Sequence, residues 1–268
     1  MLYLHFQYRR NASWRIALAM AGLLFSFGCG QYGTQTYNNC VVNSDQQNSF
    51  RGHWQTTPVP VAVFTGGFDS TDQASIGSAI STWNAFSTSS KGYNFIQPGG
   101  SPIQNISGSN AASTANLCSM SVVTSSGFSG NVMIEATTNW PSDQADLTGL
   151  TSLCPTTVSG DPYHVILNAV VQINYTYFFV NGQPQPDLQS TVLHELGHVM
   201  GLDHSCSTTA GVLPLCSSSP SAYQTAVMFP YMTFTGIYGN QNRALQENDE
   251  QRVNCLYTAS SSATGSGN

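Results

Sequence analysis

His194-Glu195-Leu196-Gly197-His198-Val199-Met200-Gly201-Leu202-Asp203-His204 is the stretch that decides the architecture of this chain. Its fixed positions read H-E-x-x-H-x-x-G-x-x-H. His194 and His198 are four residues apart, so on an α-helix both imidazoles lie on one face and can meet one ion. Gly201 suits the left-handed turn that ends a helix. Such a turn lets His204 return to the same ion.

The residues before His194 predict the helix that this spacing requires. Pro186 and Asp187 suit a helix entry, and Asp187 is a candidate N-cap. An apolar stripe follows at helical spacing, formed by Leu188, Val192, Leu196 and Val199. We therefore expect a helix that begins after Asp187 and ends at Gly201.

Three neutral imidazoles predict one mononuclear zinc site with His194, His198 and His204 as ligands. A fourth position left open is typical of a catalytic zinc site rather than a structural one. Zinc lowers the pKa of a bound water to about 7. Glu195, next to the first ligand, is the candidate catalytic general base: it takes the water's proton during attack on a carbonyl and passes it to the leaving amine.

The motif resembles that of the metzincin zinc peptidases, which carry a methionine turn downstream. Residues 226–230, Ala-Val-Met-Phe-Pro, are similar to that turn. The resemblance implies that Met228 forms an apolar floor beneath the zinc, whereas Met in general is more often an ordinary core residue. Ser205, directly after the third histidine, resembles the matrixin branch.

Segment 245–257 is similar to the last helix of matrixin catalytic domains. Asp249 matches an acidic position whose carboxylate braces the methionine turn in that family, and a solvated helix residue is the alternative. The resemblance also assigns 59–64 to a first strand, 70–86 to a first long helix, and 132–137 to the edge strand that pairs with extended substrate.

The resemblance implies an α+β fold of the metzincin or zincin-like class. This fold has a twisted, mostly parallel sheet, an active-site helix, a second long helix and a C-terminal helix. It implies a metalloendopeptidase that hydrolyses peptide bonds of protein or peptide substrates. The alternative is a catalytically silent cell-surface binding protein on a metzincin scaffold.

The chain also departs from the family pattern. Only six histidines are present, so we expect one catalytic Zn²⁺ and no second, structural zinc. The specificity wall of matrixins reads Pro-x-Tyr, whereas Tyr231 here follows Pro230 directly, and these two residues are the candidates for the substrate pocket. Calcium is left open because the sequence holds no calcium-loop pattern.

Charge is scarce in this 268-residue chain, of which 7% is Asp, Glu, Lys or Arg. Without the N-terminal segment, four basic residues face 13 acidic ones, which gives a net charge of about −9 with His neutral. That balance argues against nucleic acid as a partner. We expect a monomer.

The N-terminus predicts export. Arg9, Arg10 and Arg15 precede an apolar run that is too short to span a bilayer, so residues 1–28 fit a signal peptide. Cys29 after Gly28 resembles a bacterial lipobox, which makes it a lipidation candidate and predicts either a cell-envelope lipoprotein or a secreted protein. A lipid anchor there is the one membrane contact that we expect.

The remaining chain divides into a tether or wrap at 29–57, the zinc metallopeptidase catalytic domain at 58–258, and a disordered tail at 259–268. Lipidation of Cys29 would leave six of the seven cysteines, an even number suited to three disulfides in an exported protein. Six cysteines allow 15 connectivities. The pairs we favour are Cys206–Cys216, Cys118–Cys154 and Cys40–Cys255.

Overall fold

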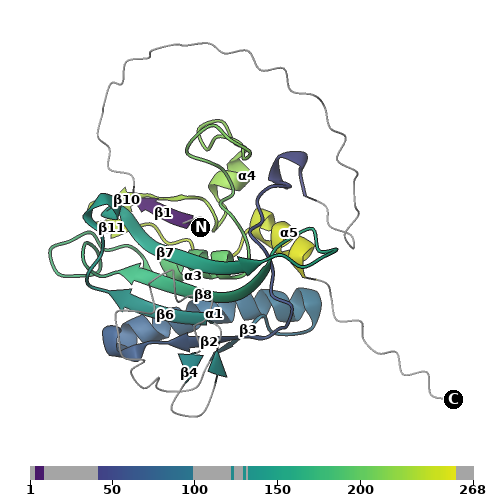
Figure 1. Ribbon diagram of the computed structural model, residues 1–268. Coiled ribbons are helices and arrows are strands. Elements are labelled where there is room, and N and C mark those ends of the chain that lie inside the picture. The colour runs from purple at the N-terminus through teal and green to yellow at the C-terminus, as the bar shows by residue number, and fades with distance from the viewer. Residues whose placement is uncertain (1–3, 9–41, 99–121, 124–128, 131, 258–268) are drawn as a thin grey trace.

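The structure is a computed structural model that describes residues 4–8, 42–98, 122–123, 129–130 and 132–257. Its centre is a twisted sheet with the strand order β3-β2-β6-β8-β7 (Figure 1). The first four of these strands run parallel, and β7 runs antiparallel to β8. The strands are β2 (Val59–Val63), β3 (Ile96–Pro98), β6 (Val132–Thr137), β7 (Leu147–Thr156) and β8 (Val165–Asn174).

Three helices accompany this sheet: α1 (Ser70–Lys91), α3 (Leu188–Val199) and α5 (Glu247–Leu256). Helix α1 begins with a capping box between Asp69 and Asp72 and ends at Gly92, whose φ of 81° only glycine adopts without strain. The α+β class, the mostly parallel sheet, the active-site helix, the long helix and the C-terminal helix are confirmed.

Helices α1 and α3 pack on each other over the same face of the sheet (Figure 1). Trp83 of α1 is fully buried in this contact, and its indole N–H donates to the carbonyl of Leu193 at 3.0 Å. Apolar residues of β2, β6 and β8 complete the core below them. The helix that carries the metal-binding motif is thus held from below by the sheet and from one side by α1.

One edge of the sheet lies beside α3. There, β1 (Leu4–Tyr8) pairs antiparallel with β7 and parallel with β9 (Tyr231–Met232). Residues 4–8 belong to the segment that the sequence predicts to be a signal peptide; export itself stays a prediction. At this side of the sheet, β1 lies as an extended strand between β7 and β9.

One expectation about the strands needs correction. Strand β6 (132–137) pairs with both β2 and β8, so its backbone hydrogen bonds are taken up inside the sheet and it is not the edge strand. Strand β7, which the sequence did not single out, lies between β8 and β1, and β9 follows β1 at the end of the sheet.

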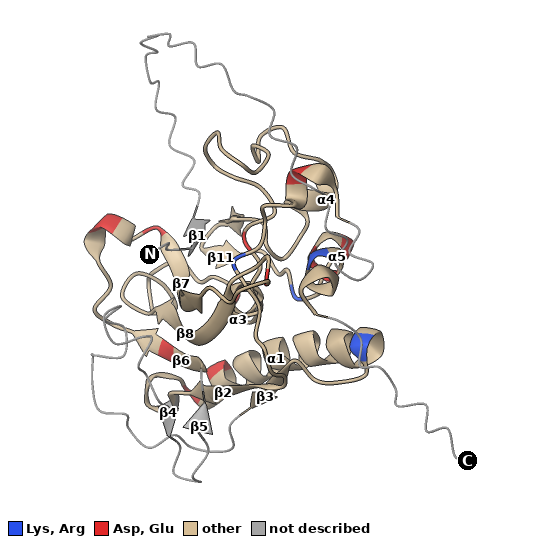
Figure 2. Cartoon of the chain, turned by 45° about the vertical axis from the view of Figure 1, so that its right-hand side comes forward, with Lys and Arg blue, Asp and Glu red and all other residues tan. Residues whose placement is uncertain are grey.

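The other described elements are short. They are the 3-10 turns η1 (Ser44–Gln46), η2 (Thr65–Gly67) and η3 (Ser142–Gln144), helix α4 (Ser221–Gln224), and the strand pairs β4 (Val122–Val123) with β5 (Ser129–Gly130) and β10 (Phe234–Thr235) with β11 (Tyr238–Gly239). Charged residues are sparse along the chain (Figure 2). Within the described ranges, no helix has the length and apolar character to cross a bilayer.

Candidate metal centre

Helix α3 begins where the sequence predicts. The Asp187 side chain accepts a hydrogen bond from the backbone N–H of Ser190 at 2.9 Å and also forms an ion pair with Arg243. Val192, Leu193 and Leu196 are fully buried in the core. This packing fixes the rotation of the helix about its axis, because turning it would expose those side chains.

The three histidines meet at one point. One ligand nitrogen of each of His194, His198 and His204 lies within 4.8 Å of the others. His194 Nδ1 donates to the carbonyl of Val227 at 2.6 Å, and His198 Nδ1 donates to the carbonyl of Leu202 at 2.8 Å. A proton held on Nδ1 leaves the lone pair of Nε2 for a metal ion. In His198 this Nε2 atom is buried and has no hydrogen-bond partner among the described residues.

Burial also favours the neutral form of His194 and His198. It lowers the pKa of His194 well below the ordinary value, and the neighbouring His198 lowers it further. Burial lowers the pKa of His198 to about 4, against the opposing hydrogen bond to Leu202. Neutral imidazole is the form that binds zinc. The three-histidine donor set, with the tautomer and neutral charge of His194 and His198, therefore fits one Zn²⁺.

Glu195 lies between the two helical ligands and is fully buried. Its Oε2 accepts a hydrogen bond from Thr151 Oγ1 at 2.6 Å, while Oε1 has no partner among the described residues. Burial raises the pKa of Glu195 to about 8, and the Thr151 hydroxyl acts in the opposite direction. The carboxyl group therefore has one oxygen held by β7 and one that can exchange a proton.

Strand β7 also limits the space around this carboxyl group. A Cβ on Gly149 would lie 2.7 Å from Glu195 Oε1, closer than real Cβ contacts allow. Sequence reasoning found neither Gly149 nor Thr151, because 44 residues separate Thr151 from Glu195 and only strand pairing brings β7 to the helix. Thr and Gly in a predicted strand carry no signal of this role.

The chain turns back after α3 at Gly201, whose φ is 91°. A Cβ at this position would overlap the carbonyl oxygen of Gly52. Glycine is therefore required twice, for the left-handed backbone and for the close approach of another segment. His204 follows in the returning loop and is half-buried.

A segment of the predicted wrap, residues 46–54, lies along this returning loop. The segment forms a hydrogen bond with every second residue from the end of α3 into the loop. Trp54 Nε1 donates to Val199 O at 2.7 Å and Arg51 N to Gly201 O at 2.7 Å. Asp203 N donates to Ser49 O at 2.8 Å, and Gln46 Nε2 donates to Ser205 O at 3.0 Å. Arg51 also forms an ion pair with Asp203 at 2.6 Å. No sequence pattern in either segment predicts that they pair.

Residues 226–230, the predicted methionine turn, pack against α3. Met228 is fully buried, and its sulfur packs so tightly on α3 that a Cβ at Gly197 would collide with it. The carboxylate of Asp249 accepts hydrogen bonds from the backbone N–H groups of Val227 at 2.8 Å and Met228 at 3.1 Å. Asp249 is fully buried, so its alternative interpretation as a solvated residue is wrong.

A pocket of about 130 Å³ opens beside this turn. Tyr231 lines it together with Val227, Phe229 and Met232. The carbonyl of Val227 also holds His194, so the pocket lies next to the first histidine. Pro230, the other candidate for the pocket, is buried in the turn and does not line it.

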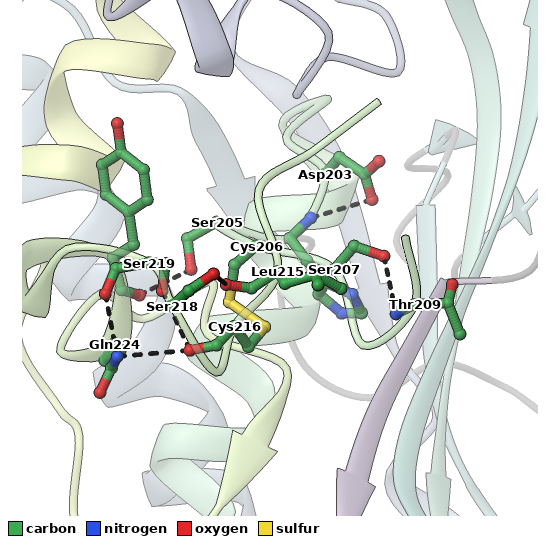
Figure 3. Close-up of a disulfide and its surroundings, with 12 residues drawn as sticks. Asp203, Ser205, Cys206, Ser207, Thr209, Leu215, Cys216, Ser218, Ser219 and Gln224 are labelled. Atoms are coloured by element: carbon green, nitrogen blue, oxygen red, sulfur yellow. Dashed lines mark hydrogen bonds between the residues drawn. A yellow bond between two sulfur atoms is a disulfide. The ribbon is translucent and has the colours of Figure 1, made fainter. Parts of the chain in front are cut away.

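The loop after His204 is closed by the Cys206–Cys216 disulfide, which confirms that predicted pair (Figure 3). Hydrogen bonds on either side join the two arms of the loop, among them Ser207 N to Pro214 O and Cys216 N to Ser207 O. Cys154 and Cys255 are also disulfide-bonded. Their predicted partners, Cys118 and Cys40, lie outside the described residues, as does Cys29.

Two comparisons with known proteins bear on this geometry. Residues 111–224 match the family model of Matrixin, peptidase M10. The matched stretch contains β6, β7, β8 and α3, and ends before Met228. Comparison with curated proteins gives no match.

Proposed function

Because this chain carries a matrixin-like metzincin catalytic domain, we propose that it is a zinc-dependent endopeptidase with Glu195 as its general base. The family match supports a metallopeptidase and polypeptide substrates. The catalytic assignment rests on one observation. Glu195 directly follows His194, the first of the three converging histidines. Its buried Oε1 has no hydrogen-bond partner among the described residues.

His194, His198 and His204 would hold the ion. Zinc bound there supplies a Lewis acid for the scissile carbonyl and a positive charge that favours the ionised form of Glu195. Glu195 takes a proton from the attacking water and returns it to the leaving amine. Thr151 keeps Oε2 in place, so that Oε1 is the oxygen that moves the proton.

Substrate is proposed to bind as an extended strand beside β7. The pairing of β1 with β7 on one side and β9 on the other supports this, because an extended segment at this place forms backbone hydrogen bonds with both strands. Met228 would line the floor of the metal centre, and Tyr231 would line the side-chain pocket.

We further propose that the protein is exported, either secreted or anchored through a lipid on Cys29. The disulfide bonds are compatible with an oxidising compartment. Labelling of cells with a radioactive fatty acid, comparing wild type with Cys29→Ala, tests the anchor: no incorporation in the wild type would contradict it.

The test of the peptidase is cleavage of an unfolded protein by zinc-loaded wild type and by Glu195→Gln. The amide keeps the size of the side chain but cannot accept the proton, so we expect activity to fall by about 10³-fold or more. Glu135→Gln is the matched control: this partly buried glutamate also has a pKa raised by burial but lies on β6, away from the histidines.

Zinc content measured on all three proteins separates the outcomes. Equal zinc, full activity in Glu135→Gln and loss in Glu195→Gln are expected. Wild type that binds zinc but cleaves none of a panel of unfolded proteins would instead favour the silent binding protein. Equal cleavage by wild type and Glu195→Gln would refute Glu195 as the base.

A further inference from the structure

Helix α5 buries an arginine directly behind the third histidine. Arg252 is fully buried, and its Nη1 donates to the backbone carbonyls of Asp203 at 2.8 Å and His204 at 3.3 Å. Its Nε donates to the carbonyl of Asn248 in its own helix at 3.3 Å. The guanidinium therefore ties α5 to the backbone carbonyls on both sides of the Cα atom of His204.

The same face of α5 holds the methionine turn. Asp249, one helical turn before Arg252, forms an ion pair with it over 3.6 Å and accepts the N–H groups of Val227 and Met228. The carbonyl of Val227 in turn accepts the Nδ1 proton of His194. One pair of charged side chains thus connects the backbone of the third histidine with the backbone that orients the first.

Packing by itself does not account for an arginine at this place. Desolvation lowers the pKa of Arg252 and so opposes its charge. Replacing a buried ion pair by apolar residues of similar volume is often neutral or stabilising in proteins. In addition, Nη2 has no hydrogen-bond partner among the described residues. Unlike an apolar side chain, the guanidinium donates hydrogen bonds to the carbonyl oxygens of Asp203 and His204.

We propose that Arg252 is a positioning residue for the metal centre, which sets the place of His204 relative to His194 and His198. His194 and His198 are held by the backbone of α3, whereas His204 lies in the returning loop, beyond the hydrogen-bond ladder of that helix. Arg252 supports this loop from the side of α5, in addition to the contacts that the wrap segment 46–54 makes with it. The inference rests on the proposed function only in taking zinc as the ion.

The experiment compares metal binding by the full chain as wild type, Arg252→Met, Arg252→Lys and Lys91→Met. Methionine fills the volume of the arginine stem without charge or donors. Lysine keeps the charge but lacks the planar fork that reaches two carbonyls. Lys91, a buried cation at the end of α1, is the matched control because α1 supplies no histidine to the cluster.

Zn²⁺ affinity is measured by competition with a chelator, the Co²⁺ form by its visible absorption spectrum, and the fold of the metal-free protein by circular dichroism. We expect Arg252→Met to bind zinc about 10- to 100-fold more weakly, the range usual for residues that orient metal ligands. Its Co²⁺ spectrum should change, Arg252→Lys should be intermediate, and Lys91→Met should match wild type.

A folded Arg252→Met that binds zinc within twofold of wild type, with an unchanged Co²⁺ spectrum, would overturn the proposal. If Arg252→Met does not fold, Arg252→Lys decides: unchanged affinity and spectrum overturn the proposal, and weaker binding with an altered spectrum supports it. Wild type that takes up neither metal would refute the proposed function itself, and this inference with it.

Discussion

Helix α3 and the loop that returns from it each bring histidine to the same point, but they are held in different ways. His194 and His198 are set by the geometry of one helix with an N-cap and an apolar stripe of its own. His204 depends on Gly201, on the wrap segment 46–54, and on Arg252 of α5. Interactions within one helix therefore place two of the three histidines, whereas contacts between segments far apart in the chain place the third.

The two oxygens of Glu195 show the same division. The position of Glu195 on α3 follows from the sequence motif. The hydrogen bond to its Oε2 comes from Thr151 of β7, and Gly149 of the same strand lies close to its Oε1. Changes in the loop should thus act on metal binding, whereas changes in β7 should act on the proton transfer and leave the metal in place. The predictions below test this separation.

The largest effect is expected from Gly201→Ala. A Cβ there meets the carbonyl oxygen of Gly52, and a φ of 91° is strained for alanine. We expect a loss of several kcal/mol of stability and a fall in zinc affinity of more than about 100-fold. Thermal unfolding and chelator competition measure the two effects.

Gly77→Ala serves as the control for this substitution. Gly77 lies within α1, and a Cβ there contacts nothing within 4 Å. Alanine should raise stability by about 0.5–1 kcal/mol and leave zinc affinity unchanged. If both variants behave alike, the turn at Gly201 is not the constraint that we describe.

Gly149→Ala should separate catalysis from metal binding. The added methyl group would push on Glu195 Oε1 and displace the oxygen that moves the proton. We expect kcat to fall by about 10²-fold with unchanged zinc content, because a small misplacement of a catalytic group is costly. Loss of zinc together with activity would show that β7 also supports the metal ligands.

Thr151→Val should shift the pH profile. The Thr151 hydroxyl lowers the pKa of Glu195, so its removal raises that pKa, and the base form appears only at higher pH. The acid limb of kcat/KM should move upward, with activity on that limb reduced roughly 5- to 10-fold and regained as the pH rises. A uniform loss at every pH would mean that the hydroxyl positions the carboxyl group without affecting its protonation.

The smallest effect is expected from Trp54→Phe in the wrap. The substitution removes the donor to Val199 O, and it should cost about 1–3 kcal/mol of stability together with a modest loss of zinc affinity. Trp140→Phe is matched to it, because the Trp140 indole also donates to a carbonyl, that of Gln144, in a separate apolar cluster. An equal loss of zinc affinity in both variants would contradict a specific role of the wrap.

Several parts of the fold were predictable because their signals are local. Helix α3 follows from Asp187 and an apolar stripe, and the Cys206–Cys216 pair closes a short loop. Strand β7 was missed because its sequence, Leu-Thr-Gly-Leu-Thr-Ser-Leu-Cys-Pro-Thr, alternates only partly and contains Gly and Pro. The interior place of β6 was missed because strand order is a property of the whole sheet.

The sequence alone predicted the chemistry, because three imidazoles and a carboxylate stand at spacings that a helix and one glycine turn bring to a single point. This holds because helix geometry repeats over a few residues and depends little on the rest of the chain. Only the tertiary structure decided which groups surround that centre. Thr151, Gly149, Gln46, Trp54 and Arg252 reach it from segments far apart in the chain. Their contacts arise from strand pairing and core packing, which are fixed only when the whole domain buries its apolar surface.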